Sequence, residues 1–122
     1  MNRFIALLLA LALAAVSCSG DDTSGDAPRD PALPDGVDGL ISLEVIDGEL
    51  AGGAQTVEFV RGDQLRIELT GNSDDQIHVH AYDFYIDPVD GEGVLDFAAL
   101  IPGTFEIELE ESGRLLVRMT VS

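Results

Sequence analysis

The feature that most constrains the fold is a regular alternation of apolar and polar residues in short segments between residues 40 and 122. In Gln64–Thr70, for example, three aliphatic residues fall on one side of the chain while Arg66 and Glu68 fall on the other. A period of two residues is that of a β-strand with one buried face. Clusters of Gly, Pro and Asp separate the segments, as is usual for turns between strands. The pattern therefore predicts strands and no helix.

The alternating segments recur about every 8–12 residues, a spacing typical of an all-β sandwich or barrel. We expect about seven or eight strands in one small domain that spans residues 40–122. The expected strands are Leu40–Ile46, Thr56–Val60, Gln64–Thr70, Gln76–Ala81, Phe84–Val89, Val94–Ala98, Thr104–Leu109 and Arg114–Val121.

The last two segments can be paired from the sequence. If Glu111-Ser112-Gly113 is a three-residue loop, Gly113 takes the left-handed conformation that such a loop requires. The register then pairs apolar with apolar residues on the core side and acids with bases on the outer side. The core pairs are Leu109–Leu115, Ile107–Val117 and Phe105–Met119, and the outer pairs are Glu110–Arg114 and Glu106–Arg118.

The first residues have the composition of a secretory signal peptide. Arg3 is followed by the apolar run Phe4–Val16, which is shorter than the ~20 residues of a membrane-spanning helix. The run leads into Ala15-Val16-Ser17-Cys18, which resembles a bacterial lipobox, although Ala replaces the usual first Leu. We expect a signal peptide at residues 1–17 and a lipidated Cys18, carrying palmitate among its chains. Ordinary cleavage of a secreted protein, the alternative, would leave an unpaired thiol in an oxidising compartment.

Cys18 is the only cysteine of the chain. Once lipidated, it leaves no thiol for disulfides, nucleophilic catalysis or thiolate metal ligation. Residues 18–39 continue with Ser, Gly, Asp and Pro and have no apolar periodicity, so we expect a disordered acidic tether. The domain would then be lipid-anchored at the cell membrane and face the extracellular or periplasmic side.

The chain is strongly acidic. It has 23 Asp and Glu against 6 Lys and Arg, for a net charge of −17. Nucleic-acid affinity comes from clustered cations, so we exclude nucleic acid as a partner. A metal ion or a cationic envelope protein fits this charge better.

Both histidines of the chain occur together, as His78-Val79-His80. Residues two apart on a strand share a face about 6.7 Å apart, so both imidazoles could reach one metal ion. Ile77 and Val79 would occupy the opposite, apolar face, and Asp83 follows closely in the sequence. Spacing alone also allows an exposed polar strand face that carries two imidazoles by chance.

The residues from Val60 to Val121 resemble the cupredoxin-like domains of bacterial envelope lipoproteins. The matching segments are RGDQLRIEL, DDQIHVHAYD and VLDFAALIPGTFEIEL. The resemblance implies a Greek-key β-sandwich, and it implies a first copper ligand among His78 and His80. It places the other ligands of the family's copper proteins, a Cys, a second His and usually a Met, after a Pro-Gly-x-aromatic motif, which here is Pro102–Phe105.

The sequence departs from this pattern at the ligand loop. Glu108 stands where the resemblance implies the thiolate ligand, no His follows His80, and the loop is the tight Glu111–Gly113 turn. We expect Met119 to point into the core. A blue-copper site needs a Cys sulfur and two His, so we exclude a type-1 copper electron carrier.

Two functions remain. In the first, the domain binds Cu(II) or Zn(II) without catalysis, through His78 and His80 with Asp83 or Glu108. In the second, it is a metal-free structural or protein-interaction module that presents an acidic surface. We expect no enzymatic activity, because the chain has no nucleophile motif and no nucleotide-binding glycine loop.

Overall fold

The computed structural model describes residues 33–122, which belong to one compact unit. The predicted signal peptide, Cys18 and most of the predicted tether lie outside the described residues. Within residues 33–122 all regular structure is β, and no helix is long and apolar enough to cross a membrane. The strands are β1 (Gly39–Ile46), β2 (Glu49–Leu50), β3 (Gln55–Phe59), β4 (Gln64–Gly71), β5 (Ile77–Val79), β6 (Phe84–Ile86), β7 (Gly93–Ala98), β8 (Gly103–Leu109) and β9 (Leu115–Val121).

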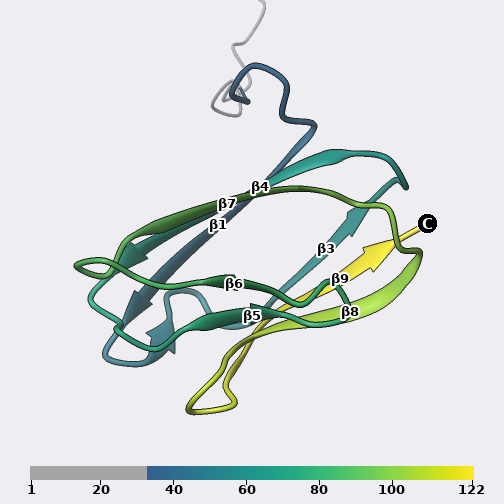
Figure 1. Cartoon of the computed structure of the whole chain (residues 1–122). Helices are drawn as coiled ribbons and strands as arrows, with labels where there is room; N and C mark the ends of the chain where they lie inside the picture. Colours follow the sequence, from purple (N-terminus) through teal and green to yellow (C-terminus); the bar gives the residue numbers. More distant parts are fainter. Residues whose placement is uncertain (1–32) are drawn as a thin grey trace, which may run out of the picture. The chain divides into compact units, whose positions relative to one another are not determined.

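The strands form two sheets that face each other as a β-sandwich (Figure 1). One sheet has the order β2-β1-β4-β7 and the other the order β3-β9-β8-β5-β6. The chain crosses repeatedly between the sheets, so β1 pairs with β4 and β3 with β9 in parallel, while the other strand pairs are antiparallel. Such non-sequential neighbours are typical of the Greek-key sandwich that was expected.

The alternation in the sequence corresponds to burial between the sheets. In β4, for example, Leu65, Ile67 and Leu69 are buried while Arg66 and Glu68 face outward. Aliphatic residues supply most of the core, and burying each contributes about 1.5–3 kcal/mol. The buried apolar side chains are Ile41, Leu43, Val45, Leu50, Leu65, Ile67, Leu69, Ile77, Val79, Ile86, Phe97, Ala99, Ile107, Leu109, Leu116, Val117, Met119 and Val121.

All eight predicted strands are present with shifted ends, and β2 was not predicted because two residues cannot show alternation. The largest change is in Gln76–Ala81, of which only Ile77–Val79 is strand. Ala81 has a φ of 69°, in the left-handed region, so it turns the chain instead of extending it. The segment from Phe84 similarly ends at Ile86, close before Pro88, which has no N–H for a sheet.

The predicted register of the last hairpin is correct away from its turn. Phe105 pairs with Met119, Ile107 with Val117, and Glu106 with Arg118. Gly113 has the predicted left-handed conformation, with a φ of 67°.

Near the turn the predicted register is wrong by one residue. A bulge between Ile107 and Glu108 places Glu108, and not Leu109, opposite Leu115. The backbone N–H of Leu109 instead donates to the carbonyl of Arg114, at 2.9 Å. The extra residue on β9 allows Leu116 to be fully buried. The predicted Glu110–Arg114 pair is therefore not formed, and Arg114 lies 3.8 Å from Glu49 instead.

Candidate metal centre

Strand β5 presents His78 on the outer face of the five-stranded sheet. Ile77 and Val79 are fully buried on its inner face, as the sequence predicts. Because successive side chains of a strand point to opposite sides, His78 faces outward. Within the sheet β5 lies between β8 and β6, so His78 has neighbours on both sides.

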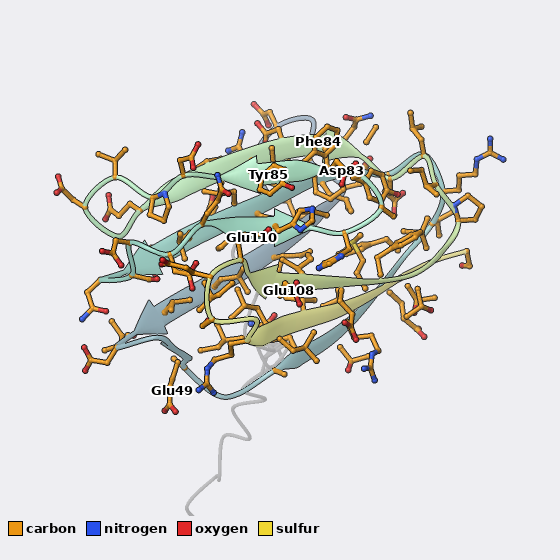
Figure 2. All side chains as sticks on the ribbon, turned by 60° about the horizontal axis from the view of Figure 1, so that its bottom comes forward. Glu49, Asp83, Phe84, Tyr85, Glu108 and Glu110 are labelled. Carbon is orange, nitrogen blue, oxygen red and sulfur yellow. The ribbon has the colours of Figure 1, made fainter. Side chains whose placement is uncertain are left out.

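Those cross-strand neighbours are Glu108 on β8 and Tyr85 on β6. The Tyr85 ring stacks on the His78 ring with a centroid distance of 4.3 Å and an interplanar angle of 4°. This cover leaves the His78 side chain only 12% exposed. Figure 2 shows Tyr85, Glu108, Glu110 and Asp83 gathered on this face.

His80 lies one residue beyond β5 and is held beside His78 by the backbone. Its N–H donates to the carbonyl of Glu106 at 3.0 Å, which continues the pairing with β8. The chain then turns back through left-handed residues, Ala81 with a φ of 69° and Asp83 with a φ of 55°. The two imidazole centroids lie 4.4 Å apart, with the rings tilted by 37°.

Glu108 brings a carboxylate to the two imidazoles. Its Oε1 lies 2.6 Å from Nε2 of His80. His78, His80 and Glu108 each offer one ligand atom, and these atoms all lie within 4.8 Å of one another. A metal ion about 2.0–2.2 Å from each donor requires donor separations of roughly 3–4 Å, so the side chains would have to rotate slightly to hold one.

Two further carboxylates flank His78. Glu110 Oε2 lies 3.0 Å from its Nδ1, and Asp83 Oδ1 lies 3.4 Å from its Nε2. Asp83, which the sequence analysis named as a candidate ligand, thus approaches one imidazole but is not part of the three-residue cluster. Its side chain is 83% exposed.

Three carboxyl groups, those of Asp83, Glu108 and Glu110, lie next to the two imidazoles. Partial burial raises the pKa of the Tyr85 phenol above its ordinary value, and the nearby charges of Glu110 and Asp83 raise it further. The phenol therefore stays neutral at physiological pH. Three carboxylates around two imidazoles favour the binding of a cation.

Two features of the site were not predicted from the sequence, namely the contact of Glu110 with His78 and the stacking of Tyr85 on the same ring. Glu110 was expected to pair with Arg114, which the bulge prevents. The sequence nevertheless placed Glu110 near the site, because Glu106, Glu108 and Glu110 alternate with apolar residues and therefore share one strand face.

Met119 and Tyr82 have structural roles. Met119 is fully buried in the core, as expected, and does not reach the outer face. The Tyr82 hydroxyl accepts a hydrogen bond from Ile101 N–H at 3.1 Å and donates one to Ile101 C=O at 3.0 Å. Its ring packs edge-on against Phe97 and Phe105. Tyr82 is therefore a packing residue.

Comparisons with known proteins identify the fold. No family model matches the chain, and no curated protein does. The NMR structure of a copper binding protein in its apo form is 20% identical, with a TM-score of 0.54 over 75% of this chain and 93% of that one. A chain of a heme-copper terminal oxidase dimer, solved by cryo-EM, is 14% identical, with a TM-score of 0.54 over 82% of this chain and 76% of that one. A multicopper oxidase crystal structure is 20% identical, with a TM-score of 0.47 over 77% of this chain and 46% of that one. The domain has a cupredoxin-like β-sandwich fold.

Proposed function

We propose that this domain binds one Cu(II) or Zn(II) ion through His78, His80 and Glu108. The observation that carries the proposal is the convergence of their ligand atoms to within 4.8 Å on one sheet face. Imidazole and carboxylate donors suit both metals. The similarity in fold to a protein described as copper binding also supports the choice of metal.

In this proposal Glu110 and Asp83 orient His78. A ligating histidine usually presents its second ring nitrogen to a carboxylate, which fixes the ring and strengthens the ligand. His78 has a carboxylate near each nitrogen, so either nitrogen can face the ion while the other is held. Tyr85 further limits the rotation of the His78 ring by stacking on it.

We further propose that the protein is a non-catalytic lipoprotein, anchored in the cell membrane through Cys18 and facing the extracellular or periplasmic side. The support is the lipobox-like Ala15–Cys18 segment after a short apolar run. Labelling of cells with a lipid precursor tests this proposal. Label should be incorporated into the unsubstituted chain, and persistence of label in a Cys18→Ala chain would contradict the anchor.

Metal binding is tested by thermal unfolding with and without metal. A Cys18→Ala chain, which lacks the competing thiol, is compared with the same chain carrying His78→Ala and His80→Ala. Metal at about 100 times its Kd should stabilise the first by about 2.7 kcal/mol and raise its Tm by about 10–20 °C. If both chains respond alike, the site does not exist, and the metal-free interaction module becomes the better hypothesis.

A further inference from the structure

The donor atoms of the metal centre are all nitrogen and oxygen. Within residues 33–122 the only sulfur atom belongs to Met119, which is fully buried between the sheets. The centre lies on the opposite, outer face of the same sheet, with His78 and Glu108 as cross-strand neighbours. No sulfur of the described residues can therefore reach the ion.

This donor set distinguishes the two oxidation states of copper. Imidazole and carboxylate suit Cu(II), whereas soft thiolate and thioether ligands select Cu(I). Resting on the metal binding proposed above, we propose that the site holds copper as Cu(II) and releases it on reduction to Cu(I). Reduction would thus regulate whether this domain keeps its copper.

The site is open to a reductant. The His80 side chain is 43% exposed and the Glu108 side chain is 23% exposed. A small ene-diol of the ascorbate class can supply the electron. One electron passes from the ene-diol to Cu(II), which becomes Cu(I), while the ene-diol loses a proton and becomes its radical.

Release breaks only bonds between the ion and the protein. The two imidazole nitrogens and the Glu108 oxygen would give up Cu(I) to a soft thioether or thiolate acceptor in solution, and no residue would change its oxidation state. The metal-free contacts then re-form, with Glu108 Oε1 at 2.6 Å from His80 Nε2 and Glu110 Oε2 at 3.0 Å from His78 Nδ1. The protein is ready to bind Cu(II) again.

The test measures copper retention. The Cys18→Ala chain is loaded with Cu(II), reduced anaerobically with ascorbate in the presence of free methionine as a thioether acceptor, desalted and assayed for bound copper. We expect the reduced protein to lose most of its copper, while an unreduced sample keeps it. A zinc-loaded sample should keep its metal in ascorbate, because Zn(II) has no redox chemistry.

A gain-of-function variant tests the role of the donor type. Glu108→Met places a thioether beside the imidazoles, so it should retain Cu(I) at least about tenfold better than the parent chain. Glu106→Met is the matched control, because Glu106 lies on the same face of β8 but pairs with Arg118, 3.1 Å away. The control should lose copper as the parent does.

Each outcome is decisive. A parent chain that does not load Cu(II) refutes the proposed metal binding itself. A parent chain that loads Cu(II) and keeps the copper after reduction overturns the release inference and leaves metal binding intact. Equal retention by the two methionine variants overturns the argument from donor softness.

Discussion

The most informative single substitution is Glu110→Gln. Glu110 Oε2 lies 3.0 Å from Nδ1 of His78, and its side chain is 44% exposed. Glutamine keeps the size and a carbonyl acceptor but removes the negative charge. If Glu110 acts on the metal only through His78, the site should survive with reduced affinity.

The size of the loss follows from the geometry. An ion about 2 Å from an imidazole nitrogen lies roughly 6 Å from a carboxylate that contacts the same ring. A divalent ion and a unit charge at this distance attract by about 1.4 kcal/mol in the dielectric of water. This corresponds to about tenfold in affinity, which is the lower end of the range usual for carboxylates that support a metal-ligating histidine.

Calorimetric titration of Zn(II) and Cu(II) into the Cys18→Ala chain measures this loss. The matched control is Glu111→Gln, which removes the same charge one residue away, and Glu111 has no contact with either histidine among the ion pairs of the described domain. We expect about tenfold weaker binding for Glu110→Gln and less than about threefold for the control.

Two results would refute this reasoning. Equal losses in both variants would show that only the general negative charge of the domain attracts the ion. An unchanged affinity in Glu110→Gln would show that Glu110 does not orient His78.

Three further predictions concern the fold around the site. Tyr82→Phe removes two hydrogen bonds to a loop backbone, so it should lower the free energy of unfolding by about 1–2 kcal/mol in denaturant titration and leave metal affinity unchanged. Gly71 has a φ of 122° and packs against the β1 backbone, so Gly71→Ala should cost about 3 kcal/mol or more, whereas Gly52→Ala, in open space, should cost less. The Arg66 guanidinium lowers the pKa of Asp96. The stabilisation from this pair is therefore present above the ordinary carboxyl pKa and is lost as pH falls through the lowered pKa of Asp96. Carboxyl NMR should show a lowered titration midpoint for Asp96, and this midpoint should return to the ordinary range in Arg66→Gln.

Each of these predictions has a clear contrary result. A Tyr82→Phe chain with weakened metal binding would make this residue part of the site. Equal costs for the two glycine substitutions would show that the close backbone approach at Gly71 has no effect on stability. An Asp96 midpoint that does not respond to Arg66→Gln would assign its low pKa to another cause.

The sandwich was predictable from the sequence because the alternation is strong where one strand face is buried. In β4 and in most of β8, each buried residue is followed by an outward-facing polar one, which fixes the register of a strand. The same logic predicted correctly that His78 would face outward between Ile77 and Val79. It also predicted correctly that Met119 would be buried.

The bulge and the turn could not be predicted in this way. The shift near Ile107 buries both Leu116 and Val117, two successive residues that a regular alternation would place on opposite faces. Left-handed Ala81 is equally unexpected, because glycine is the usual residue there. Both features shape the site, since the bulge frees Glu110 from Arg114 and the turn places His80 beside His78.

Some of the acidic residues have a structural role in loops, which the net charge alone does not reveal. Several aspartates accept hydrogen bonds from backbone N–H groups in loops. Asp38 binds the N–H of Gln64, and Asp75 binds those of Glu111 and Ser112. These carboxylates therefore fix loops as well as contributing to the net charge.

The central claim is that both imidazoles bind one metal ion. Its most direct test is electron paramagnetic resonance of the Cys18→Ala chain loaded with an equimolar amount of Cu(II), with pulsed detection of coupled imidazole nitrogens. Our account predicts a non-blue Cu(II) centre with both imidazoles coordinated, and a single imidazole in either His78→Ala or His80→Ala. A spectrum without imidazole coupling, or one that both substitutions leave unchanged, would contradict it.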